Sequence, residues 1–195
     1  MRAGQGWQVR SWCSCVVAAA AWGLAWHAGV ARADDPNPFA ARAGLDVARA
    51  SASAWAGDSY LVYVENDEPV GAAGTAERWG YLFYSPSLDQ SRAYSVRDGK
   101  VVAAGTLGMK FEAPPLSLDW IDSGAALEVG DRVAASEFRK AGGAQLTTML
   151  LMRGAFQDED PNQTTWTLIY TSPKAPSLFV VVDAAQAKVR RTWRG

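Results

Sequence analysis

Two eight-residue stretches of the chain follow the same pattern of apolar and polar positions. WGYLFYSP at 79–86 and WTLIYTSP at 166–173 both begin with tryptophan and both end in Ser-Pro. Successive residues of a strand face opposite sides of a sheet, so this alternation places large apolar side chains in one row. We predict that the following residues form the structural core beneath a helix: Trp79, Tyr81, Phe83, Trp166, Leu168 and Tyr170.

The shift that superimposes these two stretches also aligns their surroundings. The strand-like run 59–64 falls on 146–151, and the Ala-rich stretch 42–54 falls on 129–141. Matching features in the same order predict an internal repeat. Each copy is then predicted to contain one helix followed by strands.

In the first copy, Asn37 and Pro38 are typical of a helix start, and the helix is expected to run toward Ala54. Strands are predicted at the following positions: 59–65, 78–85 and 92–97, with 100–103 extending the sheet. In the second copy, Asp122 and Ser123 are expected to cap a helix over 124–140 that ends at Gly142-Gly143. Strands are predicted there at 145–152, 165–171 and 178–183.

These elements predict an α+β fold of two repeated units, each with one helix packed on a three- to four-stranded antiparallel sheet. The units are expected at 34–103 and 121–195, joined by a linker at 104–120. Because each unit alone has a small core, the two units are expected to bury a second sheet face against each other.

Residues 1–33 have the pattern of a secretory signal peptide. Arg2 and Arg10 precede an apolar run over 16–30, and Ala31-Arg32-Ala33 provides a small-residue cleavage pattern. Cleavage near Ala33 predicts an exported protein, periplasmic or secreted. The alternative is an uncleaved membrane anchor. The mature chain is predicted to contain no membrane span.

The composition limits which catalytic groups and metal ligands the mature chain can supply. The two cysteines and the single histidine, Cys13, Cys15 and His27, all lie in the leader. Catalysis by Ser-His-Asp or Cys-His groups, and zinc, copper or haem sites built on these ligands, are therefore excluded from residues 34–195. We predict no cofactor.

Charge argues against two classes of partner. Loss of the three leader arginines leaves 16 basic against 20 acidic residues, so the mature net charge is −4. This mildly acidic, mixed composition predicts no binding to nucleic acid and no basic face for anionic membranes.

Six blocks of sequence carry a family resemblance: WAGDSYLVYVEN, ERWGYLFYSP, VRDGKVV, LDWIDSGAALEV, TTWTLIYTSP and LFVVVDAAQAKV. They resemble exported bacterial proteins with tandem PepSY-like units. The resemblance implies one helix against a small antiparallel sheet in each unit, and a protease-inhibiting or protein-binding role without catalytic residues. Ala185-Gln186-Ala187 replaces the glycine-containing turn that is usual in the family.

A few residues are candidates for sites. Trp55 and Trp193 lie outside the apolar rows and are the better aromatic candidates for binding. The acidic loop residues Asp158, Glu159 and Asp160 offer oxygen ligands for calcium, although a solvated hairpin loop explains them as well. Ser172 and Lys174 are candidates for a Ser/Lys pair, although a strand end with a solvated lysine explains them as well.

The sequence therefore predicts a non-catalytic exported binding module. Its partner is expected to be a protein or peptide, with inhibition of a peptidase as a sharper form of this role. Two alternatives stay open at this stage: a small hydrolase that uses carboxylates or the Ser/Lys pair, and a structural component of the envelope.

Overall fold

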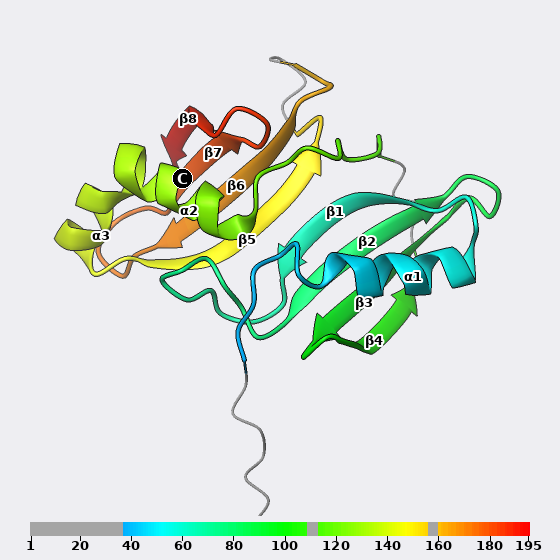
Figure 1. The fold of residues 1–195 in the computed structure, drawn as a ribbon. Helices are drawn as coiled ribbons and strands as arrows, with labels where there is room; N and C mark the ends of the chain where they lie inside the picture. Colours follow the sequence, from blue (N-terminus) through cyan, green and yellow to red (C-terminus); the bar gives the residue numbers. More distant parts are fainter. Residues whose placement is uncertain (1–36, 109–112, 156–159) are drawn as a thin grey trace, which may run out of the picture. The chain divides into compact units, whose positions relative to one another are not determined.

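The computed structural model describes residues 37–108, 113–155 and 160–195. Eight strands form one antiparallel sheet in the order β4-β3-β2-β1-β5-β6-β7-β8 (Figure 1). The strands are β1 (Tyr60–Asn66), β2 (Trp79–Ser85), β3 (Gln90–Arg97), β4 (Lys100–Thr106), β5 (Gln145–Arg153), β6 (Thr164–Thr171), β7 (Leu178–Asp183) and β8 (Lys188–Arg194). The predicted signal peptide, 1–33, lies outside the described residues.

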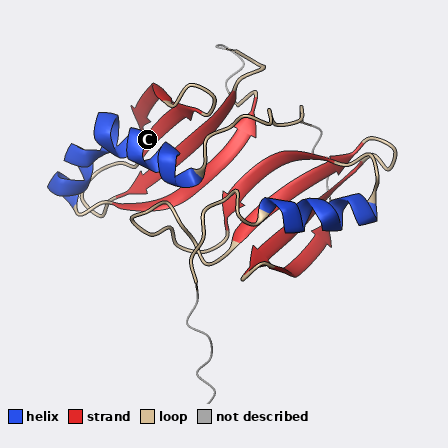
Figure 2. Ribbon diagram, viewed as in Figure 1, coloured by secondary structure: helices blue, strands red, loops and turns tan. Residues whose placement is uncertain are grey.

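The helices lie on one face of the sheet (Figure 2). They are α1 (Leu45–Trp55), α2 (Ser123–Gly130) and α3 (Ser136–Gly142), with a π-helical turn, η1 (Asp131–Ala135), between the last two. The predicted cap of the second helix is confirmed, because the Asp122 side chain accepts a hydrogen bond from the Ser123 amide. Gly143 ends α3 in the left-handed conformation that glycine adopts readily.

The predicted start of the first helix is wrong. Helix α1 begins at Leu45, after Gly44, and no side chain caps it. Directly after Asn37 and Pro38 the chain is extended and not helical, because Phe39 pairs with Ala76 in an isolated antiparallel bridge. A cap-like sequence was thus outweighed by tertiary backbone pairing.

The predicted fold class is also wrong. Two repeated units of one helix on a three- to four-stranded sheet would give two sheets, whereas β1 pairs with β5 and joins all eight strands into one. The pairing matches Tyr63 with Met152, Val64 with Leu151 and Glu65 with Leu150. Pairing satisfies backbone groups that an unpaired edge would expose, so β1 and β5 meet edge to edge instead of stacking face to face.

The unit boundaries at 34–103, 104–120 and 121–195 stay predictions. Two details of the strands were missed, because β4 continues past 103 to Thr106 and the cationic segment Lys188–Arg194 forms the edge strand β8. Both strands are largely exposed, which weakened the apolar signal that predicts a strand.

One apolar core lies between the sheet and the helices. All six residues of the predicted core rows have at most 1 % of their surface exposed. The Trp79 indole donates to the Phe39 carbonyl at 2.7 Å, and the Trp166 indole donates to the Ile121 carbonyl at 2.8 Å. The two indole rings meet edge to face with centroids 6.2 Å apart, so the core continues across the junction of β1 and β5.

Asn66 extends the β1–β5 junction beyond the last backbone pair. Its side-chain oxygen accepts from the Met149 amide at 2.6 Å, and its amide group donates to the carbonyls of Thr147 and Glu68. We expect Asn66→Ala to lower the free energy of unfolding by about 1–3 kcal/mol, because partly buried backbone groups lose their partners. Urea denaturation measures this loss. The exposed Gln145→Ala is the control and should change stability by no more than about 0.5 kcal/mol; equal effects of the two variants would contradict the role of Asn66.

Candidate binding surface

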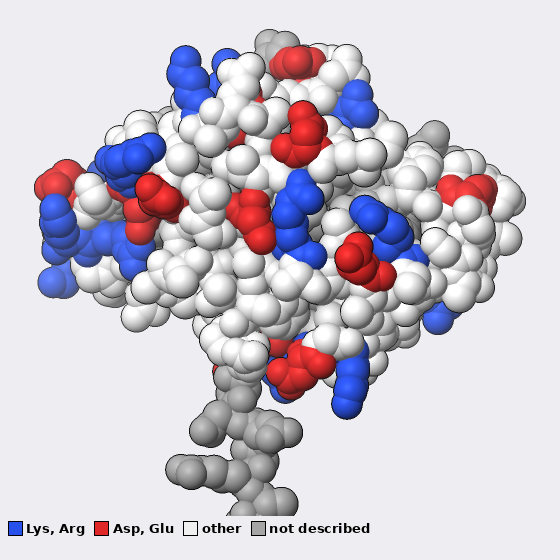
Figure 3. All heavy atoms as spheres, in the orientation of Figure 1, with Lys and Arg blue, Asp and Glu red and all other residues white. Residues whose placement is uncertain are grey.

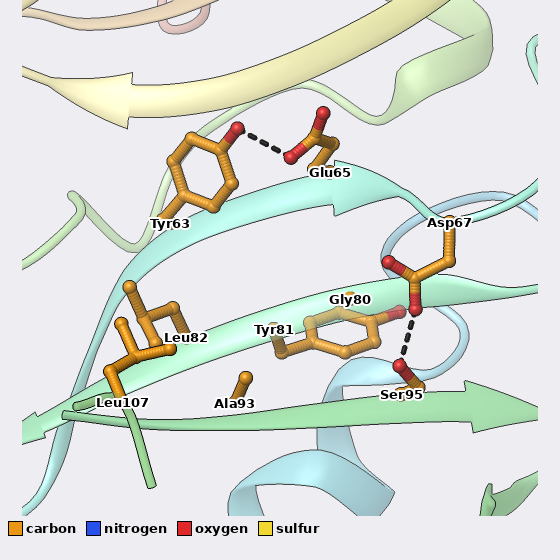
Figure 4. Close-up of a pocket in the computed structure, with 9 residues that line it drawn as sticks. All are labelled: Tyr63, Glu65, Asp67, Gly80, Tyr81, Leu82, Ala93, Ser95 and Leu107. Carbon is orange, nitrogen blue, oxygen red and sulfur yellow. Dashed lines mark hydrogen bonds between the residues drawn. The ribbon is translucent and has the colours of Figure 1, made fainter. Parts of the chain in front are cut away.

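The face of the sheet opposite the helices contains a hollow of about 250 Å³ (Figure 4). Strand alternation creates it, since Val64, Tyr94 and Val96 belong to the helix-covered core and their strand neighbours point the other way. The hollow is lined by Tyr63, Glu65, Asp67, Gly80, Tyr81, Leu82, Ala93, Ser95 and Leu107.

Strand register determines which side chains meet in the hollow. Tyr63 lies opposite Leu82 and, on the next strand, Ala93, which makes one end apolar. Glu65 lies opposite Gly80 and then Ser95, which makes the other end polar. Leu107 adds an apolar wall and packs against the small cluster around Leu82.

Gly80 makes room for the carboxylate of Asp67. A Cβ atom at position 80 would lie 2.8 Å from Oδ1 of Asp67, which is closer than a Cβ atom normally comes to any atom not bonded to it. The Asp67 carboxylate accepts a short hydrogen bond from the Ser95 hydroxyl, and its Oδ2 lies 3.6 Å from Nε of Arg78. Glycine in the middle of a strand often marks such a close approach.

Tyr63 orients the second carboxylate. Its hydroxyl donates to Oε2 of Glu65 at 2.7 Å (Figure 4). Burial, and then the hydrogen bond to Glu65, raise the pKa of Tyr63, so the phenol stays protonated and continues to donate at neutral pH. In the described parts of the chain, no hydrogen bond reaches the other oxygen of Glu65, which can accept from a further donor.

Two acids, Glu65 and Asp67, line the polar end of the hollow, and acidic groups outnumber basic groups in the ion-pair network next to it. Arg78 contacts Asp67 and Glu68, and Arg97 contacts Glu68 and Glu77. With Glu65, which is in none of these ion pairs, the group contains four carboxylates and two guanidinium groups, which leaves two negative charges in excess. The neighbouring β3–β4 turn adds Asp98 and Lys100, one charge of each sign. By contrast, acidic and basic side chains are interspersed on the helix-bearing face (Figure 3).

The two edges of the sheet differ in chemistry. Strand β8 carries cations at four of its seven positions, and charge on an edge strand discourages pairing with another chain. Strand β4 is KVVAAGT, charged only at Lys100, and is exposed at six of seven positions. Strand β4 is therefore the edge that a further strand can join.

Strand register also shows which amides of β4 point away from the sheet. The Leu107 amide donates to the Ser91 carbonyl, so residues two and four positions earlier, Gly105 and Ala103, also direct their backbone groups toward β3. The intervening Ala104 and Thr106 then direct theirs outward, because antiparallel pairs alternate in this way.

The tryptophans predicted as binding candidates lie on separate elements, away from the hollow. Trp55 ends α1 and is half-buried, with the Arg92 guanidinium 5.9 Å from its ring centre. Trp193 lies in β8 and stacks on Phe179, with ring centroids 4.8 Å apart and an angle of 6° between the planes.

The other predicted sites are not assembled by the described residues. Asp158 and Glu159 lie outside them, and Asp160 accepts a hydrogen bond from the Asn162 amide. Among the described residues, no three His, Cys, Asp or Glu side chains are grouped to hold a metal ion. Ser172 accepts from the backbone amide of Lys174 at 3.1 Å, an arrangement typical of a turn.

Sequence reasoning missed the hollow and its carboxylates. A usable signal was present, because Glu65 alternates with buried Val64 on a strand and Gly80 interrupts an apolar strand. What the sequence could not supply was the register that places these residues opposite each other.

Comparison with known proteins defines the fold alone. No family model matches the chain, so none supports the PepSY-like resemblance, and no curated protein sequence matches it. The fold is similar to the crystal structure of a candidate lipoprotein from Clostridium difficile 630, with a TM-score of 0.52 and 12% sequence identity. The match covers 76% of this chain and 90% of that one. None of the helices in the described parts of the chain has the length and apolar character needed to cross a membrane.

Proposed function

We propose that the chain is a non-catalytic, exported module that binds a protein or peptide. The signal-peptide pattern at 1–33 supports export, as does the similarity to a candidate lipoprotein. The observation that carries the binding role is strand β4, a seven-residue exposed edge without charge after Lys100.

An extended segment of the partner adds to β4 through backbone hydrogen bonds. Strand addition of this kind needs outward-facing amides and carbonyls along an open edge, which Ala104 and Thr106 supply. Small side chains at 103–105 leave the approach to this edge open. The charged edge β8 makes strand β4 the preferred of the two edges.

Ala104→Pro tests strand addition at β4. Proline removes the outward amide of residue 104 and leaves the amides that pair with β3, so the fold should persist while binding weakens about 10- to 100-fold. The ligand is a nine-residue peptide selected from a displayed random library on the wild-type protein, and fluorescence polarisation measures its dissociation constant.

Ala104→Thr is the matched control for this variant. It changes the side chain but retains the amide, so we expect an affinity within about threefold of wild type. Thermal unfolding of both variants verifies that they are folded. Equal affinity of Ala104→Pro and Ala104→Thr for the selected peptide would show that β4 is not the binding edge.

A further inference from the structure

We propose that the hollow on the open face of the sheet is a binding subsite for a lysine or arginine side chain. The inference rests on the proposed function, in that the side chain belongs to a protein or peptide partner. It goes further by assigning a second contact surface and the chemical class of the group bound there.

The charge around the polar end of the hollow favours a cation. The guanidinium groups of Arg78 and Arg97 pair with Asp67, Glu68 and Glu77, and among the described residues Glu65 has no ion-pair partner. Glu65 accepts only the uncharged hydroxyl of Tyr63 among these contacts. An incoming ammonium or guanidinium group therefore finds one carboxylate oxygen of Glu65 and a surrounding negative field.

The apolar end fits the stem of such a side chain. Leu82, Ala93 and Leu107 form a continuous apolar surface next to the carboxylates. Lysine and arginine bury their methylene groups on such surfaces while the charged head contacts polar groups. The hollow combines both features over the length of one side chain, which distinguishes a basic residue from a metal ion or a small free cation.

The carboxylates are held in place before a ligand arrives. Tyr63 orients Glu65, Ser95 orients Asp67, and Gly80 leaves the space that the Asp67 carboxylate fills. Groups that are already positioned lose less conformational freedom on binding, which favours affinity. The glycine thus has a role that no other residue could take without displacing Asp67.

Short capped peptides test the subsite directly. We would titrate the purified protein with acetyl-Gly-Gly-Lys-Gly-Gly-amide and with its norleucine counterpart, which has a similar apolar stem but no charge. Amide chemical shifts of β1, β2 and β3 report binding. The lysine peptide, and its arginine equivalent, should bind at least about tenfold more tightly than the norleucine peptide, and more weakly as salt is raised.

Two variants of the hollow separate charge from geometry. Glu65→Gln removes the carboxylate contact and should weaken lysine-peptide binding about five- to tenfold. Gly80→Ala keeps every charge but displaces Asp67, and should also weaken binding. The matched control is Glu128→Gln, an exposed position on α2 that makes the same change in net charge and should leave binding unaltered.

The possible outcomes distinguish this proposal from strand addition at β4. Equal binding of the lysine and norleucine peptides would overturn the subsite, as would equal binding to wild type and Glu65→Gln. Ala104→Pro should leave the lysine peptide bound as in wild type, because position 104 lies outside the hollow. Loss of lysine-peptide binding in Ala104→Pro, with Glu65→Gln unaffected, would place the cation at the edge strand and overturn its assignment to the hollow.

Discussion

Replacing Trp166 with alanine is expected to lower the free energy of unfolding by about 3–5 kcal/mol. The side chain is fully buried, and its ring meets those of Trp79 and Trp120 edge to face, with centroids 6.2 and 5.9 Å away. Alanine would lose these contacts, leave a cavity between the sheet and α2, and remove the donor to the Ile121 carbonyl. Because both cysteines of the sequence, Cys13 and Cys15, precede residue 34, no disulfide within residues 34–195 can compensate.

Trp193→Ala is the matched control, since it deletes the same side chain from an edge strand. Trp193 is half-buried and stacks on Phe179, so its loss should cost only about 1 kcal/mol. Urea denaturation measures both, with unchanged m-values required for the comparison. An intermediate loss is expected for Trp166→Phe, which retains a ring but leaves the Ile121 carbonyl without its donor. If Trp166→Ala costs no more than Trp193→Ala, the core is not organised around Trp166.

Local structure could be predicted from this sequence wherever apolar alternation was strong. The stretches that begin at Trp79 and Trp166 form strands with their large residues buried, as the alternation indicated. Asp122 caps its helix because a short acidic side chain at this position can accept from the first amides of the helix, which have no partner within it. These predictions need only contacts between residues close in sequence and the choice of a buried face.

Pairing between distant strands could not be predicted. Nothing in the residues of β1 or β5 distinguishes an edge that pairs from one that is exposed, and both arrangements bury the same row of apolar side chains. The repeated pattern favoured two separate sheets, whereas edge pairing gave one. The missed start of α1 has a similar origin, because the pairing of Phe39 with Ala76 depends on contacts that no local motif encodes.

The candidate site was less accessible to prediction than the fold. Glu65 and Asp67 are two ordinary acids among 20, and only register with Gly80 and Ser95 makes them part of a hollow. The open edge also depends on topology, since the uncharged segment 101–106 is an edge only because nothing pairs with its outer side among the described residues. The proposed function thus depends on residues that come together only when the sheet is assembled.

Asp183→Asn is expected to lower the free energy of unfolding by about 3 kcal/mol at neutral pH. Only 2% of Asp183 is exposed, and one carboxylate oxygen accepts from the amides of Ala185 and Gln186, both at 2.9 Å. The other oxygen accepts from Gln163 at 2.8 Å and from the Arg190 guanidinium at 2.7 Å. The side-chain amide group of asparagine would face the donor groups of Gln163 and Arg190 with a donor of its own. Arg190 would also lose its counter-charge.

The pH dependence of this loss identifies its electrostatic part. Burial alone would raise the pKa of Asp183, but the hydrogen bonds from Gln186, Arg190 and Ala185 outweigh it and lower the pKa below its ordinary value. The charged carboxylate therefore stabilises the fold above the unfolded-state pKa of about 3.9, and this contribution is lost as pH falls through the lower folded-state pKa. The difference between wild type and Asp183→Asn should be constant from about pH 5 to 8 and shrink below about pH 4.

Asp160→Asn is the control for the charge change, because Asp160 is exposed and should alter stability by no more than about 0.5 kcal/mol. Urea denaturation at several pH values provides the measurement. A difference between wild type and Asp183→Asn that stays unchanged down to about pH 2.5 would assign the loss to packing and not to charge. A difference that shrinks below about pH 4 would instead show that Asp183 closes the turn between β7 and β8 as an anion. Arg190 on the edge strand is then held by charge as well as by backbone pairing.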